Sequence, residues 1–248
     1  MFPSIIHSYS ILHLPTVDST NNYAASKENQ PNIQHKTVIV ASFQSNGKGQ
    51  FHNKWQSEAG LNLLFSIYLQ PKKLSATQQF DLSRISALAL RDSLSYFLTK
   101  QITIKWPNDI FIEGKKIAGI LIENTVTQNR IDRSIIGIGI NVNQKIFEGL
   151  NASSFLIESG KKWELKRILE FFLYRFDLYY ETLNENRHEL LQSFDLHLHD
   201  RNKWLTMHSH KNKEFLGRIV GTNENGMLIV EDSELKIHHF NHKEISFS

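Results

Sequence analysis

The chain of 248 residues contains no cysteine. This absence excludes disulfides, thiolate metal ligands and cysteine nucleophiles, and it is typical of proteins in a reducing compartment. Long apolar runs are also missing, since no stretch approaches the roughly 18 residues that a membrane-spanning helix needs. Residues 1–14 contain no lysine or arginine and therefore lack the basic start of a signal peptide. We expect a cytoplasmic protein that does not bind a membrane.

The chain also lacks a large excess of either positive or negative charge. The 28 lysines and arginines nearly balance the 25 aspartates and glutamates, which leaves a formal net charge of +3. This excess is too small to indicate a nucleic acid partner, so none is expected. Most of the 12 histidines lie late in the chain, without the spacing of a metal-ligand set. No metal-binding residue is therefore expected.

Apolar periodicity divides the chain into a longer first part and a shorter second part. In the first part, strands are expected at residues 4–14, 37–44, 61–69, 102–105, 109–112, 117–123 and 133–142, and helices at 18–27, 79–100, 163–183 and 185–196. In the second part, strands are expected at 204–210, 214–222, 227–231 and 235–240, with Asn225-Gly226 in a hairpin turn. This pattern predicts an α+β fold, with a mixed β-sheet flanked by helices in residues 1–195 and a small SH3-like β-barrel in residues 196–248.

A polar, glycine-rich loop follows the expected strand at residues 37–44. Gly47 and Gly49 allow backbone N–H groups to face a ligand, and Lys48 and Lys54 add positive charge. Such a loop can hold a phosphate or a carboxylate. Taken alone, a short glycine–lysine loop is more often an ordinary turn, and this one lacks the Walker A spacing. The loop indicates an anion site only in combination with other segments.

Two lysines introduce the next candidate segments. Residues 105–109 read Lys-Trp-Pro-Asn-Asp, in which Pro107 keeps Trp106 out of the helical region and fixes a bend between two strands. Residues 116–123 read Lys-Ile-Ala-Gly-Ile-Leu-Ile-Glu, and the small Ala-Gly pair leaves room for a flat ligand beside the backbone. Either lysine alone is typical of a solvated charge. Together with the bend and the small-residue strand, they favour a binding site.

Two further segments are ambiguous when each is taken alone. Residues 137–143 read Gly-Ile-Gly-Ile-Asn-Val-Asn, which fits a tightly packed core strand or a strand that brings amide groups to a ligand. Residues 18–21 read Asp-Ser-Thr-Asn, which is typical of a helix N-cap. Hydroxyl groups at the start of a helix can also hydrogen-bond a ligand, so both interpretations stay open.

In chain order, these five segments resemble the catalytic domain of the biotin–protein ligase family. The resemblance extends from about residue 11 to residue 196, and a small C-terminal β domain is also typical of the family. It implies a biotin/lipoate ligase-like, class II synthetase-like fold. It also implies that ATP activates biotin to biotinyl-5′-AMP with release of pyrophosphate. Biotin then passes to a lysine of the biotin carboxyl carrier domain of a carboxylase.

The resemblance implies which residues bind each substrate. The biotin site would comprise Ser19, Thr20, Asn21, Gln44, Lys48, Gly49, Gln50, Trp55 and Lys116. The nucleotide site would comprise Lys54, Lys105, Asn108 and Asn141, with Mg²⁺ on the phosphates of ATP. Lys116 and Lys105 would be the catalytic cations, because fixed positive charge offsets the repulsion between a carboxylate and the anionic α-phosphate.

Two positions in the glycine-rich loop depart from the family pattern. Gln50 stands where many members carry arginine, and His52 stands where many carry glycine. A neutral amide holds a phosphate less tightly than a guanidinium does. Lys48 and Lys54, which flank the same loop, are therefore expected to compensate for the missing charge.

Other classes of protein share some of these features. A lipoate–protein ligase has the same fold and adenylation chemistry, whereas octanoyl transferases that use a cysteine are excluded by its absence. A biotin-sensing DNA-binding repressor needs an additional N-terminal domain, and only 17 residues precede Asp18. An inactive binding module has no need of Lys105 and Lys116. The sequence does not fix the oligomeric state, and a homodimer is compatible with the resemblance.

Overall fold

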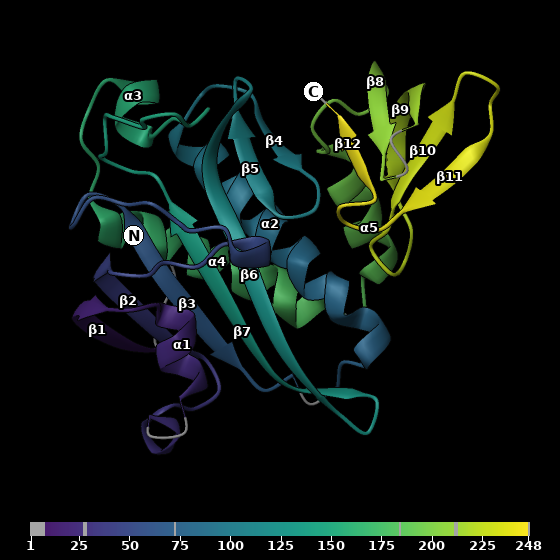
Figure 1. The fold of residues 1–248 in the computed structure, drawn as a ribbon. Coiled ribbons are helices and arrows are strands. Elements are labelled where there is room, and N and C mark those ends of the chain that lie inside the picture. Colours follow the sequence, from purple (N-terminus) through teal and green to yellow (C-terminus); the bar gives the residue numbers. More distant parts are fainter. Residues whose placement is uncertain (1–7, 27–28, 72, 184, 211–212, 248) are drawn as a thin grey trace.

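A computed structural model describes the chain except for residues 1–7, 27–28, 72, 184, 211–212 and 248, and Figure 1 shows its two sheets. The first sheet has seven strands in the order β1-β2-β3-β7-β6-β5-β4. Their bounds are β1 Ser10–Val17, β2 Thr37–Gln44, β3 Leu63–Leu69, β4 Ile102–Lys105, β5 Asp109–Ile112, β6 Lys115–Thr127 and β7 Arg130–Ile140. β1 and β2 run parallel, and the other neighbouring pairs are antiparallel. The sheet is therefore mixed, which confirms the prediction.

Helices cover the two faces of this sheet unequally. The long helices α2 (Gln79–Phe97) and α4 (Leu165–Thr182) pack together on one face, and the short α1 (Thr20–Ala25) lies on the other (Figure 1). The amphipathic pattern of α2 explains its position, because its apolar side chains are buried against the sheet and α4. On β3, Phe65 meets Phe172 of α4 edge to face, with ring centroids 5.3 Å apart. The face beside α1 is left open for a site.

The second sheet has five strands in the order β11-β10-β9-β8-β12. Their bounds are β8 Trp204–Ser209, β9 Glu214–Thr222, β10 Leu228–Asp232, β11 Ile237–Phe240 and β12 Ile245–Phe247. Asn225-Gly226 lies in the turn between β9 and β10, where the φ of Gly226 is +86°, so the predicted hairpin is confirmed. β12 was not among the expected strands. The small antiparallel sheet agrees with the SH3-like unit that the sequence predicts.

Hydrogen bonds join the two sheets. Trp106 Nε1 donates to the carbonyl of Gly226 at 2.9 Å, and Arg84 Nη2 donates to the carbonyl of Asn223 at 2.5 Å. The connecting residues 197–199 also pair with the edge strand β4. The boundary expected between residues 195 and 196 falls at the end of α5 (Arg187–Leu196), just before these contacts. The division of the chain into two domains at this boundary stays a prediction.

Three local predictions about the N-terminal part were imprecise. Within the described part the first strand spans Ser10–Val17 and continues past its expected end at residue 14, whereas its expected start at residue 4 lies outside the described residues. Helix α1 ends at Ala25, and residue 27, its expected end, also lies outside the description. The segment expected as a loop also contains a short 3₁₀ helix, Gln50–His52.

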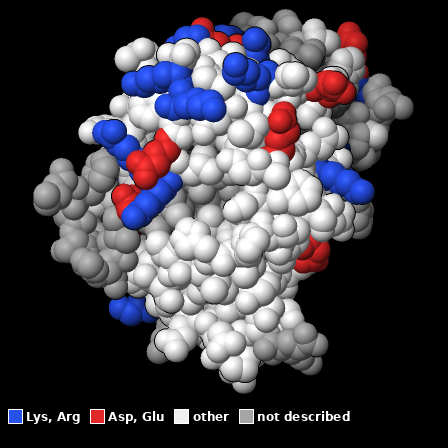
Figure 2. Space-filling model, turned by 90° about the vertical axis from the view of Figure 1, so that its left-hand side faces the viewer, with Lys and Arg blue, Asp and Glu red and all other residues white. Residues whose placement is uncertain are grey.

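The apolar character of the helices and the distribution of charged side chains relate to two possible partners, a membrane and a nucleic acid. Among the described residues, no helix has both the length and the apolar character needed to span a membrane. Figure 2 shows one face on which lysine and arginine side chains are interspersed with aspartate and glutamate. On that face the basic side chains do not form a single continuous surface.

Candidate functional site

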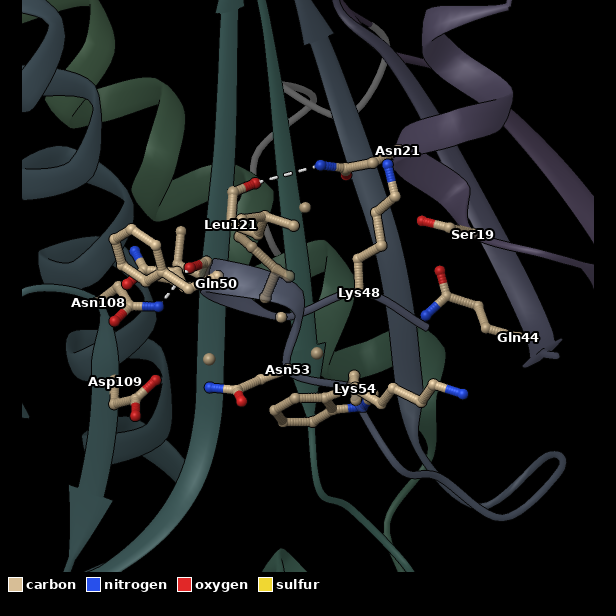
Figure 3. Close-up of a pocket in the computed structure, with 18 of the residues that line it drawn as sticks. Ser19, Asn21, Gln44, Lys48, Gln50, Asn53, Lys54, Asn108, Asp109 and Leu121 are labelled. Carbon is tan, nitrogen blue, oxygen red and sulfur yellow. Dashed lines mark hydrogen bonds between the residues drawn. The ribbon is translucent and has the colours of Figure 1, made fainter. Parts of the chain in front are cut away.

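A cavity of about 280 Å³ opens on the face of the first sheet beside α1, where the glycine-rich loop crosses the strands (Figure 3). We call residues 45–60 the glycine loop. The lining comprises Ser19, Thr20, Asn21, Gln44, Lys48, Gly49, Gln50, Phe51, Asn53, Lys54, Trp55, Asn108, Asp109, Lys116, Gly119, Ile120, Leu121, Gly137, Ile138, Gly139, His242 and Lys243. The cavity therefore brings together segments from five distant parts of the chain, including the second sheet.

At one end of the cavity, which we call the uncharged end, the lining side chains of Ser19, Thr20, Asn21 and Gln44 are polar and carry no charge. Gln44 Oε1 accepts hydrogen bonds from the backbone N–H of Thr20 at 2.7 Å and from its hydroxyl at 3.0 Å. These two bonds fix the amide of Gln44 so that its Nε2 points toward the glycine loop (Figure 3). Ser19 occupies the N-cap position of α1, as expected, but its side chain makes no capping hydrogen bond. Its hydroxyl is therefore not committed to the helix.

Asn21 is fixed from several sides at the same end. Its Nδ2 donates to Glu123 Oε2 at 2.7 Å, and Ser66 Oγ lies 2.6 Å from its Oδ1. Lys48 approaches the other oxygen of Glu123 at 3.8 Å, which ties the glycine loop to β6. This network holds Asn21 in place before any ligand binds, which reduces the loss of side-chain conformational entropy on binding.

Two glycines of β7 form the floor of the cavity. A Cβ placed on Gly137 would lie 2.3 Å from Asn21 Oδ1, and one on Gly139 would lie 2.4 Å from Trp55 Cε2. Both distances are far below a normal contact, so only glycine allows these two side chains to lie directly on the strand. The alternating glycines in residues 137–143 therefore allow Asn21 and Trp55 to pack on β7 at the cavity floor.

The glycine loop has a hairpin-like path over this floor. Lys48 and Lys54 form an antiparallel bridge, and the N–H of Gly49 donates to the carbonyl of Asn53 at 2.7 Å. At the tip, Phe51 has a left-handed φ of +52°, a conformation that costs free energy for a residue with a Cβ. The loop is thus an ordered structure that places Trp55 and two lysines at the cavity.

The opposite end of the cavity is cationic. Lys116 Nζ lies 2.7 Å from Asp109 Oδ1 and 5.6 Å from the centre of the Trp55 ring system. A register shift between β5 and β6 pairs Ile110 with Ala118 and Phe111 with Lys116. Such a bulge reverses the alternation of side chains, which brings Lys116 to the same face as Gly119. The lysine is therefore aimed into the cavity by the strand itself.

Three buried polar atoms of the described residues have no hydrogen-bond partner and belong to residues of this lining: Gln50 Oε1, Trp55 Nε1 and Asp109 Oδ1. Asp109 Oδ1 still has its ion pair with Lys116, so it is not without a partner of opposite charge. The other two are an acceptor and a donor that a ligand can satisfy. Buried polar groups without partners are rare in native proteins, and their presence here supports a ligand site.

Eleven of the thirteen expected site residues line the cavity or its rim, and two do not. Lys105 lies on β4 with its Nζ 5.0 Å from the centre of the Phe111 ring, outside the lining. Asn141 is only 4% exposed, and its backbone bonds to Ile117 and Phe155. Asn108 does line the cavity, where its Nδ2 donates to the carbonyl of Ile120 at 2.7 Å. The roles expected for Lys105 and Asn141 stay predictions.

Several lining residues were not expected from the sequence. The most distant are His242 and Lys243, which lie in the turn between β11 and β12 of the second sheet. Burial lowers the pKa of His242, and the nearby charge of Lys243 lowers it further. Phe51 and Asn53 come from the glycine loop, in which the glycines, Gln50, Trp55 and the lysines had suggested a role. No local sequence pattern marks His242 or Lys243.

The fold and the cavity define a class of protein: a mixed sheet with a small SH3-like β unit, in which a cavity lined by lysines and polar side chains lies under a glycine loop. The model of the biotin/lipoate A/B protein ligase family matches residues 14–141, slightly more than half of the chain. The chain belongs to this family.

Individual relatives and solved structures agree with the family. The bifunctional ligase/repressor BirA of Bacillus spizizenii is 30% identical over 234 residues, which cover 90% of this chain and 70% of that protein. A biotin–[acetyl-CoA-carboxylase] ligase of Paracoccus denitrificans is 34% identical over 133 residues, which cover 52% of this chain and 53% of that one. The structure of a biotin protein ligase from Aquifex aeolicus in complex with biotin and ATP superposes with a TM-score of 0.80 at 27% identity, over 96% of this chain and 98% of that one.

Proposed function

We propose that this protein is an ATP-dependent biotin–protein ligase that forms biotinyl-5′-AMP and transfers biotin to a lysine of a biotin carboxyl carrier domain. The observation that supports this most directly is a single cavity with an uncharged polar end, a glycine floor and a cationic end. The relatives named for biotin ligation and the Aquifex structure with biotin and ATP support the same substrates.

The uncharged end suits the ureido ring of biotin. A ureido group offers one carbonyl acceptor and two N–H donors, and Ser19, Thr20, Asn21 and Gln44 offer hydroxyl and amide groups that match both kinds. The indole of Trp55 lies against Gly139 and would pack on the aliphatic chain of biotin. The carboxylate at the far end of that chain would then reach Lys116.

The cationic end suits the adenylation step. A carboxylate oxygen of biotin attacks the α-phosphorus of ATP, the bond from that phosphorus to the bridging oxygen breaks, and pyrophosphate leaves. Lys116 offsets the repulsion between the two anions, and Asp109 fixes its ammonium group at 2.7 Å. The glycine loop covers the cavity and limits access of water to the acyl-adenylate, which would otherwise hydrolyse.

The second step takes place at the carboxyl carbon of biotin, which the first step has joined through oxygen to AMP. The uncharged amine of the acceptor lysine attacks the acyl group, the bond to the AMP oxygen breaks, and AMP leaves as the new amide forms. The nitrogen gives up a proton to solvent or a nearby base. The transfer to a carboxyl carrier domain is supported by the activity for which the relatives are named.

Magnesium would enter with the nucleotide rather than occupy a separate protein site. Among the described residues, no group of three or more His, Asp or Glu side chains could hold a metal ion. The only carboxylate in the described lining is that of Asp109, and it is paired with Lys116. Mg²⁺ usually keeps several waters and binds through phosphates with one or two carboxylates, which fits this lining.

The choice of acid substrate distinguishes biotin from lipoate. With ATP and Mg²⁺ present, we expect pyrophosphate release that depends on biotin and not on lipoate, because the uncharged end offers donors and acceptors for a ureido ring that lipoate lacks. The measurement is the initial rate of pyrophosphate formation with each acid at equal concentration. Equal or faster release with lipoate would contradict the proposal and favour a lipoate ligase.

Gly137→Ala tests the floor of the biotin site. The added methyl group would overlap Asn21, whose side chain is held on two sides and cannot easily move away. Overpacking of this kind costs about 1–3 kcal/mol, so we expect the Kd for biotin to rise by about tenfold or more. Ser134→Ala, on the same strand and outside the lining, is the matched control and should bind biotin normally. Unchanged affinity in Gly137→Ala would show that Asn21 does not contact biotin.

A further inference from the structure

The turn between β11 and β12 carries two residues of the second sheet into the cavity. In this turn the N–H of Glu244 donates to the carbonyl of Asn241 at 3.0 Å, and the N–H of Asn241 donates to Glu244 Oε2 at 2.7 Å. These bonds fix the turn and present His242 and Lys243 to the lining. Lys243 has a left-handed φ of +70°, a backbone conformation that favours glycine.

These two residues contact the tip of the glycine loop. The ring centroids of Phe51 and His242 are 4.7 Å apart, and Lys243 Nζ lies 3.7 Å from the centre of the Phe51 ring. Phe51 and Lys243 are both non-glycine residues in the left-handed region. Unfavourable backbone conformations that meet at one contact are typical of functional sites. We call Phe51, His242 and Lys243 the loop–turn contact.

The charges of the lining show why Lys243 matters. Four lysines line the cavity, and two of them already face a carboxylate: Lys48 faces Glu123 and Lys116 faces Asp109. Within the described part of the chain, no carboxylate oxygen lies within 4.0 Å of Lys54 or Lys243. Lys54 belongs to the loop itself and is one of the two compensating cations that the sequence predicts. Lys243 is a second uncommitted cation, from a different part of the molecule.

The glycine loop beside Lys243 has no charged group at Gln50 to hold an anion. The side chain of Gln50 is neutral, and its Oε1 is buried with no partner among the described residues. Its amide N–H groups can donate to a phosphate but supply no positive charge, so the charge that would balance an anion bound here comes from elsewhere. The ammonium of Lys243 rests on the Phe51 ring, a weaker partner than a phosphate oxygen, and can move from one to the other.

We propose that Lys243 is a nucleotide-binding residue, which reaches across from the second sheet to the phosphate of the acyl-adenylate while Phe51 positions it at the cavity mouth. This inference rests on the proposed function. It assigns the second sheet a direct part in retaining the intermediate, in addition to its packing against the first sheet.

The test measures the dissociation rate of pre-formed biotinyl-AMP from the full-length protein. Lys243→Gly removes the charge and suits the left-handed backbone, so the variant should fold normally. We expect it to release biotinyl-AMP about tenfold faster or more, the loss expected for one charge-assisted hydrogen bond. Lys243→Arg should retain most of the wild-type rate. Lys236→Ala, an exposed lysine of the same sheet that pairs with Glu234, is the control and should release it at the wild-type rate.

Phe51 is tested through its dependence on Lys243. If Phe51 positions the lysine, Phe51→Ala should speed release in the wild-type background and change little when combined with Lys243→Gly. Binding of biotin alone should be nearly unchanged in the Lys243 variants, because the proposed contact is to the phosphate.

The outcomes separate this inference from the proposed function. A wild-type protein that fails to release pyrophosphate with biotin contradicts the proposed function. A wild-type protein that is active, combined with an unchanged release rate in Lys243→Gly, overturns the role of Lys243. Fully additive effects of Phe51→Ala and Lys243→Gly overturn the positioning role of Phe51.

Discussion

Lys116→Ala is expected to slow formation of biotinyl-AMP by about 10²–10³-fold, which corresponds to roughly 3–4 kcal/mol in the barrier. The reason is that the proposed function places the carboxylate of biotin and the anionic phosphate of ATP beside its ammonium group. Asp109 holds Lys116 Nζ at 2.7 Å, and the register shift in β6 aims the side chain into the cavity. A cation that is oriented in advance stabilises developing charge without reorganising during the reaction.

The measurement for Lys116 is single-turnover formation of the adenylate at saturating biotin and ATP. Lys115→Ala is the matched control, since Lys115 is the preceding residue of the same strand, is exposed and does not line the cavity. Thermal stability should change little in Lys116→Ala, because the Lys116 side chain is one-third exposed and packs mainly toward the cavity. A near-wild-type rate would contradict a catalytic role and leave Lys116 as a structural partner of Asp109.

Short-range patterns were sufficient to predict much of the fold. β4 and β5 begin and end where the sequence indicates, because the bend at Trp106-Pro107 and the Glu113-Gly114 turn define their ends. The order of segments also predicted that the glycine loop, Lys116 and the glycines of β7 meet. These features depend on residues close together in the chain or on the family pattern, so a single sequence contains them.

Long-range geometry was not predictable in the same way. The register shift at Ile110 decides which face of β6 carries Lys116, and alternation alone gives no sign of it. Lys105 stands in a segment typical of the site, yet it lies beside Phe111 and outside the cavity lining. His242 and Lys243 reach the cavity only because the second sheet packs against the first. Such contacts depend on how two units dock, which no local pattern records.

The docking of the two sheets depends on a buried arginine, and Arg84→Ala is expected to lower the free energy of unfolding by about 3–5 kcal/mol. Arg84 of α2 is fully buried, and its Nη1 donates to Asp81 Oδ1 at 2.7 Å. Its Nη2 donates to the carbonyl of Asn223 at 2.5 Å and to Thr222 Oγ1 at 3.2 Å, both in the second sheet and its turn. Alanine would leave the Asp81 carboxylate and the Asn223 carbonyl buried with fewer donors.

The measurement for Arg84 is urea unfolding at pH 7. Arg91→Ala is the control on the same helix, because Arg91 is partly exposed and pairs with the adjacent Asp92, so a loss below about 1 kcal/mol is expected. A loss that small in Arg84→Ala would contradict the buried-network argument.

A double variant separates the ion pair from the packing around it. Removing both charges in Asp81→Leu/Arg84→Met should recover part of the stability lost in Arg84→Ala, because no buried carboxylate that has lost its Arg84 partner then remains at residue 81. Recovery should be incomplete. Arg187 Nε also donates to Asp81 Oδ2 at 2.7 Å and loses this partner in the double variant, and Arg84 contributes bonds that cross to the second sheet. If the double variant is no more stable than Arg84→Ala, the lost bonds to the second sheet, and not the loss of Arg84 beside Asp81, account for the destabilisation.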